Sequence, residues 1–172
     1  IDNRKICDTK RIYIRPNSNI EFDQKEFREQ LAKAVQRCSI GRRKIGVFLS
    51  GGLDSSVIAY ELGKIKEQVH TFTNKFVPGV QGDEDFNSDA KAAKILAEQN
   101  NFIHSEVEIT PKIFKASWND SVYYGEQPVY TANSSLYCYT NKFLSEKDIV
   151  VTMSGDMGDE ILGGYVKYNH ML

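Results

Sequence analysis

The sequence lacks the features that are typical of membrane, disulfide-rich or nucleic-acid-binding proteins. No apolar run is long enough to span a bilayer, and no charged-then-apolar leader is present. The three cysteines form no C-x-x-C pair and are odd in number, so we expect reduced thiols. With 22 basic and 23 acidic residues, the net charge of −1 provides no general field for nucleic acid or an anionic membrane. We therefore expect a cytoplasmic protein that binds neither.

The size of the chain limits the number of domains it can form. With 172 residues and 41% hydrophobic content, it can bury one core, and one domain is the simplest expectation. We assign residues 1–19 to a lead-in strand and linker and residues 20–172 to the domain. The sequence opens at Ile1 rather than a methionine and stops soon after a motif-like segment. We therefore expect a piece of a longer chain, truncated on its C-terminal side.

Apolar periodicity predicts strands that alternate with helices. Strands are predicted over 10–15, 45–49, 69–76, 103–109 and 148–153, of which the second and the last are continuous apolar runs typical of covered strands. Helices are predicted over 27–38, 55–66, 88–97, 111–122 and 134–144. We expect Cys38 to face the core and Ser88 or Asp89 to cap the third helix. The alternation favours an α/β fold with a parallel twisted sheet, right-handed crossovers and flanking helices.

The segment SGGLDSS, residues 50–56, joins a predicted buried strand to a predicted helix. Glycines let backbone N–H groups approach an anion closely, and the start of the helix offers further unpaired N–H donors with a partial positive charge. Both features favour phosphate. No lysine follows the glycines, so the segment is not the G-x-x-x-x-G-K-[ST] loop of nucleoside triphosphatases. The sequence therefore predicts a different kind of phosphate site at this strand end.

Asp54 is the unusual residue of this segment. A carboxylate in a phosphate pocket would repel the ligand unless a divalent cation lay between them, and Mg²⁺ with oxygen ligands suits that place. Asp159 and Glu160, after the last predicted strand, offer carboxylates from a second loop. One carboxylate rarely holds Mg²⁺ alone, so we predict that Asp54 and Asp159 together bind the metal.

Two motifs in the chain resemble a known family. SGGLDSS matches the pyrophosphate-binding signature of the N-type ATP pyrophosphatases. The segment SGDMGDEILGGY, residues 154–165, is similar to the second signature of the asparagine synthetase family, whose common form reads SGDGGDELFGGY. Shorter matches at 104–106, 126–128 and 134–143 lie between them, so the resemblance covers roughly residues 20–168.

The resemblance implies a Rossmann-like, adenine nucleotide α-hydrolase-like fold and an ATP-dependent carbon–nitrogen ligase. In the implied reaction a carboxylate, with aspartate the first candidate, attacks the α-phosphorus of ATP to give an acyl-adenylate and pyrophosphate. Ammonia then displaces AMP to give an amide, which is asparagine in the namesake reaction. ATP and Mg²⁺ are the implied cofactors. A glutaminase domain or subunit and a second copy in a homodimer are the implied partners.

The resemblance also implies roles for individual residues. The β- and γ-phosphates and the metal would be bound by the first motif, at Ser50, Gly51, Gly52, Asp54, Ser55 and Ser56. The nucleoside would contact strand-end and second-motif positions, at Phe48, Asn74, Ser154 and Gly155. Asp156 matches an acidic position near the acyl intermediate. Asp159 would be the second metal ligand with support from Glu160, and the predicted catalytic residues are Asp156, Asp54 and Asp159.

The sequence departs from the family in ways that keep alternatives open. Met157 stands where the family has glycine or serine. The chain contains no counterpart of the glutaminase domain, nor of a later region in which synthetases keep a lysine and an acid that stabilise the chemical step. Two alternatives follow: another acyl-adenylating synthetase, which forms a β-lactam or cyclises a peptide, and a degenerate module that binds ATP without turnover.

Several residues have simpler interpretations. The Gly-Gly turn can be structural only, and Asp54 can stabilise a helix dipole by about 0.3–1 kcal/mol. Lys75 is expected to be solvated, and His104 to be an ordinary strand residue. The aromatic residues of the two later helices are expected to pack between helices: Trp118, Tyr123, Tyr124, Tyr137 and Tyr139. Tyr130 and Thr131, in the loop between these helices, could line a pocket for the acyl substrate.

Overall fold

The computed structural model describes residue 10 and residues 21–77, 87–128 and 131–166. The strand predicted over 10–15 lies outside the described residues, apart from Lys10. Tyr130 also lies outside them. The structural statements that follow concern the described part of the chain.

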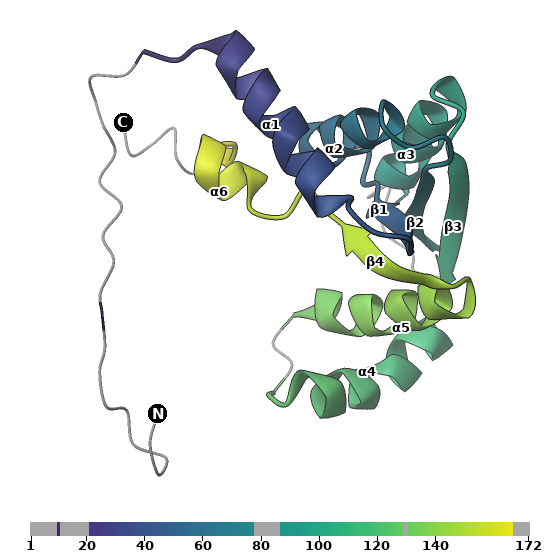
Figure 1. Ribbon diagram of the computed structural model, residues 1–172. Helices are drawn as coiled ribbons and strands as arrows, with labels where there is room; N and C mark the ends of the chain where they lie inside the picture. Colours follow the sequence, from purple (N-terminus) through teal and green to yellow (C-terminus); the bar gives the residue numbers. More distant parts are fainter. Residues whose placement is uncertain (1–9, 11–20, 78–86, 129–130, 167–172) are drawn as a thin grey trace.

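Helices and strands alternate along the chain (Figure 1). The strands are β1 (Lys44–Phe48), β2 (His70–Phe76), β3 (Ile103–Ile109) and β4 (Ile149–Met153). The helices are α1 (Gln24–Cys38), α2 (Leu53–Gly63), α3 (Ser88–Gln99), α4 (Pro111–Gly125), α5 (Ala132–Glu146) and α6 (Gly158–Leu162). Among the described helices, none has both the length and the apolar character needed to cross a membrane. Within the described residues, the strands and helices predicted from periodicity are therefore present, with ends displaced by a few residues.

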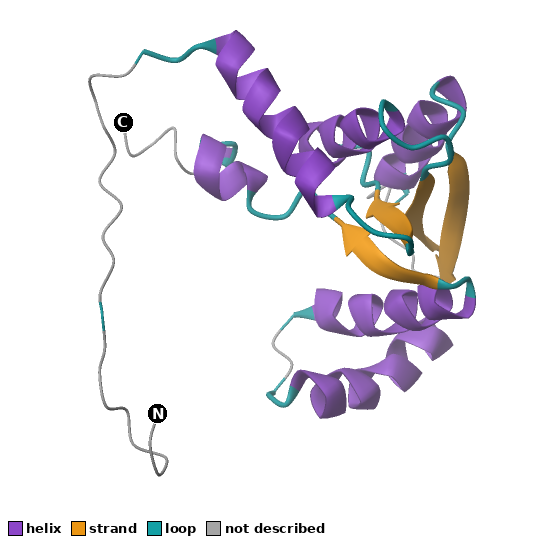
Figure 2. Cartoon of the chain, viewed as in Figure 1, coloured by secondary structure: helices purple, strands orange, loops and turns teal. Residues whose placement is uncertain are grey.

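The four strands form one parallel sheet in the order β3-β2-β1-β4 (Figure 2). β1 pairs with β2 on one side, Val47 lying opposite Thr71, and with β4 on the other, Val47 lying opposite Met153. Because all strands are parallel, their carboxyl ends meet at one edge, where open α/β sheets bind ligands. The predicted fold class is confirmed.

Each face of the sheet is covered by its own group of helices. One core contains residues of α1, α2 and α3 packed on β1 and β2, including Val35, Val47 and Ala93. The other core joins α5 and part of α4 to the opposite face, around Phe72 and Leu144. Figure 1 shows the α4–α5 pair on the side of the sheet opposite to α2 and α3. This arrangement leaves the carboxyl edge of the sheet free for the loops.

The ends of two helices explain one success and one error of the sequence-based prediction. Thr110 caps α4, since its hydroxyl accepts a 3.1 Å hydrogen bond from the Ile113 N–H, and proline occupies the first turn. The cap predicted at Ser88 or Asp89 is wrong, because the N-cap position of α3 is Asn87. The Asn87 side chain instead exchanges two 2.8 Å hydrogen bonds with the Phe76 backbone. Asn87 therefore ties α3 to the end of β2.

β4 is less buried than the covered strand that was predicted over 148–153. Ile149 is 5% exposed, but Val150 and Val151 are 55% and 38% exposed. In the described sheet β4 is an edge strand with β1 as its neighbour, so a continuous apolar run here is only partly covered. Cys38, predicted in the core-facing stripe of α1, is exposed at the last turn of that helix, while Val35 is buried.

Candidate functional site

A pocket of about 490 Å³ lies at the carboxyl edge of the sheet. We call it the strand-end pocket. Two segments form much of its wall: the first loop, residues 50–56 after β1, and the second loop, residues 154–160 after β4. Most residues named from the sequence line it: Phe48, Ser50, Gly52, Asp54, Ser55, Asn74, Ser154, Gly155, Asp156 and Asp159. The fold thus brings together two motifs that lie far apart in the chain.

The first loop is held in shape by its own hydroxyl groups. The Ser55 Oγ accepts from the Ser50 backbone N–H at 3.1 Å and lies 3.0 Å from the Ser50 Oγ. The Gly52 N–H donates to the Ser50 Oγ at 3.3 Å, and the Ser56 hydroxyl donates to the Gly52 carbonyl at 2.6 Å. Ser56 therefore stabilises the start of α2 and does not line the pocket, unlike Ser50 and Ser55.

The two glycines of the first loop differ in their surroundings. Gly51 has φ +77°, and a Cβ at this position would lie 2.7 Å from the Ala92 Cβ and 2.9 Å from the Asp89 carbonyl oxygen. A Cβ on Gly52 would contact only the Ser50 Oγ, at 3.3 Å. Gly51 is needed for the turn and for close packing on α3, whereas Gly52 presents open backbone to the pocket.

Glycines of the second loop allow it to approach Asp54. A Cβ on Gly155 would lie 2.8 Å from the Ser55 backbone nitrogen, and one on Gly158 would lie 2.6 Å from the Asp54 Cγ. The second loop therefore passes directly over the Asp54 carboxylate. Between them, Met157 has φ +74° at the N-cap of α6 and is 61% exposed. This left-handed conformation is the one that glycine adopts most readily, and methionine adopts it here.

The donor set of the pocket fits a magnesium ion. Asp54 and Asp159 both line the pocket, one from each loop, and Gly164 lies against the Asp159 carboxylate. Among the described residues, no group of three or more histidine, cysteine, aspartate or glutamate side chains could hold a metal by itself. Two carboxylates suit Mg²⁺, which completes its octahedral shell with phosphate oxygens and water, and do not suit a tetrahedral zinc site of nitrogen and sulfur ligands.

At the opposite end of the pocket, aromatic and amide side chains meet. The Phe48 ring packs edge-on against Phe72, with centroids 4.2 Å apart, and against Tyr137 at 5.5 Å. The Thr140 hydroxyl, fully buried in α5, donates a 2.7 Å hydrogen bond to the Asn74 Oδ1. This bond fixes the side chain of Asn74 at the end of β2.

Tyr137 and Asp89 were missed as pocket residues by sequence reasoning, although both line the strand-end pocket. Burial raises the pKa of the Tyr137 phenol, and the negative charge of Asp156 raises it further. The phenol is thus a protonated hydrogen-bond donor near Asp156, whose carboxylate accepts a 2.7 Å bond from the Ser154 hydroxyl. The available signal in the sequence was the tyrosine itself, whose ring is apolar but whose hydroxyl favours a hydrogen-bond partner.

Lys75 and His104 lie outside the strand-end pocket. The Lys75 Nζ donates to Glu106 at 2.6 Å, an interaction that raises the pKa of Lys75 and lowers that of Glu106. The Lys75 side chain is 41% exposed, so it is solvated as expected, and it also forms this ion pair. His104 lies 2.9 Å from the Thr71 hydroxyl, between adjacent strands, and burial lowers the pKa of its ring. Thr131 is exposed and does not line the pocket.

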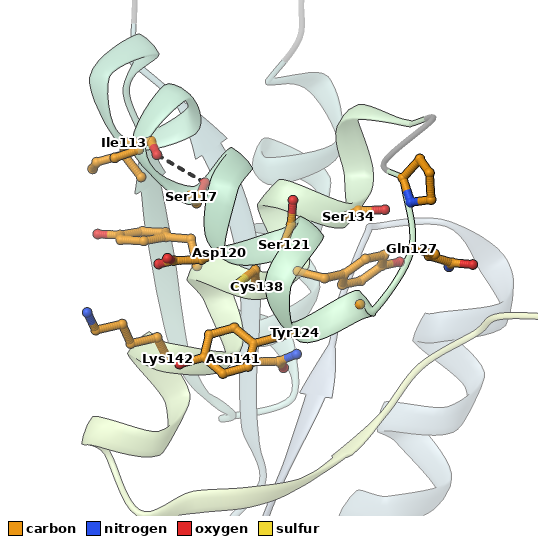
Figure 3. Close-up of a pocket in the computed structure, with 15 residues that line it drawn as sticks. Ile113, Ser117, Asp120, Ser121, Tyr124, Gln127, Ser134, Cys138, Asn141 and Lys142 are labelled. Atoms are coloured by element: carbon orange, nitrogen blue, oxygen red, sulfur yellow. Dashed lines mark hydrogen bonds between the residues drawn. The ribbon is translucent and has the colours of Figure 1, made fainter.

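A larger cavity, of about 840 Å³, lies between α4 and α5. Figure 3 shows labelled side chains of both helices around it, among them Asp120, Cys138 and Lys142, with the Ser117 hydroxyl bonded to the Ile113 carbonyl at 3.0 Å. Tyr137 lines this α4–α5 cavity as well as the strand-end pocket. The two hollows therefore adjoin.

Two of the aromatic residues on α4 do not pack between helices. Tyr123 and Tyr124 are 77% and 74% exposed, with their rings in contact at a centroid distance of 5.2 Å. The packing predicted for them is therefore wrong. Trp118, by contrast, is 37% exposed and packs against Phe114 of the same helix, with ring centroids 5.8 Å apart.

Comparison with known proteins gives consistent likenesses. A family model described as asparagine synthase matches residues 26–172. The chain is 28% identical over 160 residues to asparagine synthetase B (glutamine-hydrolysing) of Escherichia coli K12, a match that covers 86% of this chain and 28% of that protein. It is 30% identical over 160 residues to an asparagine synthetase (glutamine-hydrolysing) of Sandersonia aurantiaca, covering 88% of this chain and 30% of that protein. The chain thus spans less than a third of these relatives.

Solved structures show the same fold. NMN synthetase of Francisella tularensis matches with a TM-score of 0.54 at 20% identity, over 86% of this chain and 61% of that chain. At this identity the likeness concerns the fold alone. It agrees with the parallel sheet and flanking helices described above and with the adenine nucleotide α-hydrolase-like fold that the motifs imply.

Proposed function

The chain belongs to the asparagine synthase family, and on this premise we propose that it is the ATP-binding part of an enzyme that activates a carboxylate by adenylation and converts it to an amide. The observation that supports this most is the approach of the second loop to Asp54, which Gly155 and Gly158 permit. Two loops so placed can enclose the phosphate chain and metal of one nucleotide at the strand ends.

The proposed chemistry has two steps. A carboxylate oxygen forms a bond to the α-phosphorus of ATP while the bond from that phosphorus to the bridging oxygen breaks, and pyrophosphate leaves with the electron pair. The nitrogen of ammonia then bonds to the acyl carbon, the bond from that carbon to the phosphate oxygen breaks so that AMP leaves with the electron pair, and the nitrogen releases a proton to solvent. A free carboxylate resists amines because its leaving group would be oxide, and adenylation replaces this with a phosphate ester. The protein contributes position and charge neutralisation.

The first loop is assigned to the departing pyrophosphate. The open backbone at Gly52 can approach phosphate oxygens, and the hydroxyls of Ser50 and Ser55 face the pocket. These hydroxyls bond one another in the free protein and can turn to phosphate oxygens on binding. The N-terminus of α2 directs further N–H groups toward the same place. Gly51 and Ser56 act indirectly, by shaping the turn.

Asp54 and Asp159 are assigned to the metal. Mg²⁺ held there would supply positive charge for the phosphates, and the two carboxylates would orient it from opposite loops. Gly158 is essential to this arrangement because its missing Cβ leaves room for the Asp54 carboxylate. Glu160, which follows Asp159 in the first turn of the short helix α6, is assigned to support it.

The nucleoside and the acyl group are assigned to the remaining walls. Phe48 and Asn74 at the ends of β1 and β2, with Ser154 and Gly155 from the second loop, surround the place for the nucleoside. Asp156 is assigned to the acyl intermediate. The carboxylate substrate would enter beside Tyr137, where the strand-end pocket adjoins the α4–α5 cavity.

Aspartate and ammonia are the first candidate substrates, and the amide product is then asparagine. We further propose that the protein works in the cytoplasm, with a glutaminase domain or subunit as the source of ammonia, and that it forms a homodimer. A synthetase that forms a β-lactam or cyclises a peptide is the second candidate, and an ATP-binding module without turnover is the third. Each makes a different prediction for the same assay.

The test is an incubation of the purified chain with Mg-ATP, aspartate and ammonium, followed by separation of the nucleotides. AMP and pyrophosphate that depend on aspartate would support the synthetase, and their loss in Asp54→Asn would tie them to this pocket. Products with other carboxylates only would favour the second candidate. Mg²⁺-dependent ATP binding with no products would favour the binding module. Absence of ATP binding by a folded chain would overturn the proposal.

A further inference from the structure

A third hollow, of about 260 Å³, lies at the amino-terminal edge of the sheet, where β2, β3 and β4 begin and α5 ends. We call it the amino-edge pocket. Its floor is apolar and buried, since Phe72 and Leu144 are each 1% exposed and Ile149 is 5% exposed. A Cβ on Gly46 would lie 2.6 Å from Phe72 Cε1 and 2.9 Å from Ile149 Cγ2, so glycine sets the packing of this floor.

Polar groups without partners surround the apolar floor. His70, Ser105 and Lys147 line the pocket, and within the described part of the chain no hydrogen bond of the His70 ring or the Ser105 hydroxyl is found. His104, one strand away, contrasts with His70 because its ring is bonded to Thr71. The Lys147 Nζ lies over the Phe143 ring at 4.9 Å and has no carboxylate partner among the described residues.

The charge around His70 is positive from two elements. Burial lowers the pKa of His70, and the charges of Lys44 on β1 and Lys147 after α5 lower it further. The lining residues from β3 and β4 carry no charge. Asp148 lies 3.9 Å from Arg43 as an ion pair. The carbonyl groups of Leu144 and Ser145 lie at the C-terminal end of α5, where they would repel an anion. They already accept hydrogen bonds from the backbone N–H groups of Lys147 and Asp148, at 2.9 and 3.0 Å.

We propose that the amino-edge pocket binds a small organic anion that consists of an apolar body and one carboxylate. The carboxylate contacts His70, Ser105 and Lys147, and the apolar body lies over the buried floor against Ile103, the apolar lining residue that is 44% exposed. The volume is below the range of about 300–1,000 Å³ typical of drug-sized ligands, so the ligand is smaller than these. Burial of its apolar body favours binding, a contribution that a bare phosphate cannot make.

The proposed binding of an anion does not depend on the proposed adenylation reaction. The two pockets share one lining residue, Phe72. A bound anion favours protonated His70, so affinity rises as pH falls, and a tenfold preference corresponds to one pKa unit.

Benzoate is the probe, with benzamide as its uncharged counterpart and inorganic phosphate as an anion without an apolar body. Proton NMR of the intact chain follows the His70 ring, identified from the spectrum of His70→Asn. We expect saturable benzoate binding that raises the His70 pKa and is several-fold tighter at pH 5.5 than at pH 7.5. Benzamide and phosphate should leave the His70 pKa unchanged. Equal binding of phosphate would overturn the role of the apolar floor, and equal binding of benzamide would overturn the role of charge.

Variants locate the site without relying on one histidine. His70→Asn and Lys147→Gln should each weaken benzoate binding at least fivefold. Lys142→Gln, on the same helix but outside this pocket, is the matched control and should leave it unchanged. Lys147 is exposed, so its variant is expected to fold even if His70→Asn does not. Equal losses in Lys147→Gln and Lys142→Gln, or no saturation with the unmodified chain, would overturn the proposal.

Discussion

The first and second loops both line the strand-end pocket and lie against each other, but they are supported by different means. The first loop follows β1, which has a neighbouring strand on both sides. Its shape is set by bonds among residues 50–56, in which Ser50 and Ser55 take part repeatedly. This wall of the pocket is therefore shaped by bonds within the loop itself.

The second loop follows β4, the half-exposed edge strand. The bonds among its own residues are fewer: the Ser154 hydroxyl to Asp156 at 2.7 Å, and the Gly158 N–H to the Gly155 carbonyl at 3.2 Å. Its other bonds come from later residues, as in the 2.8 Å bond from the Tyr165 hydroxyl to Glu160. The helix that follows has five residues, none of them buried. The contrast indicates that the second loop is held less firmly by its own residues than the first loop. Under the proposed function, the metal and the nucleotide would add contacts that hold it over Asp54.

The largest effect is expected where the two loops meet, at Asp54. Asp54→Ala should reduce the affinity for Mg-ATP about a hundredfold, or roughly 2.7 kcal/mol, and remove its dependence on Mg²⁺. Calorimetric titration with ATP, with and without Mg²⁺, measures this. Asp120→Ala, in the α4–α5 cavity, is the control and should bind normally. If Asp54→Ala still binds ATP as tightly and with the same dependence on Mg²⁺, Asp54 is not a metal ligand.

A second experiment separates shape from ligand contact within the first loop. Gly51→Ala should lower the free energy of unfolding by about 2 kcal/mol, because its φ is +77° and its Cβ would overlap α3. Gly52→Ala should change it by less than about 0.5 kcal/mol. Gly52→Val should fold and yet bind ATP poorly, because its branched side chain blocks phosphate. Urea unfolding and ATP titration test all three, and equal stability of the two alanine variants would contradict the distinction.

A third substitution tests whether the second loop must close over Asp54. Gly158→Ala would place a Cβ 2.6 Å from the Asp54 Cγ, so the loop must move outward. We expect about tenfold weaker Mg-ATP binding, near 1.4 kcal/mol, with little change in unfolding. Gly125→Ala is the matched control, since a Cβ there meets nothing within 4 Å. If both variants bind equally well, the loops do not act together.

The smallest effect concerns pH and the strands beneath the first loop. Burial lowers the pKa of His104, so the unfolded chain binds a proton more readily than the folded one. The free energy of unfolding should therefore fall as pH drops below about 6.5, until the ring is also protonated in the folded state. In urea unfolding, His104→Gln should make the free energy of unfolding less dependent on pH. The dependence that remains comes from His70, whose pKa is also lowered. An unchanged pH profile in His104→Gln would show that the ring is not held neutral.

Much of the fold and part of the site could be predicted from the sequence. Alternating apolar runs predicted β1 to β4, and the order of the two motifs placed both loops at one edge of a parallel sheet. The glycines of residues 50–56 carry a local signal because the predicted phosphate binding would need open backbone, which Gly52 provides. The predicted roles of the loop residues stay predictions.

Other features depend on packing that no short segment encodes. Tyr137 lines the pocket because α5 crosses the end of β1, where its ring meets Phe48. Val150 is exposed because β4 lies at the edge of the described sheet, which an apolar run does not reveal. Asn87 occupies the N-cap position of α3, but its side chain accepts a hydrogen bond from the Phe76 N–H of β2. In each case the decisive neighbour comes from a distant part of the chain.

The open side of β4 in the described sheet has a consequence for the isolated chain in concentrated solution. An edge strand that presents unpaired backbone groups and apolar side chains is a template for a strand from another molecule. Val150 and Val151 give β4 this character. Association through this edge would add strands to the sheet next to the second loop, so its conformation would vary with protein concentration. Affinities measured on dilute and concentrated samples would then differ, and dilution is the simplest way to observe the second loop in a single chain.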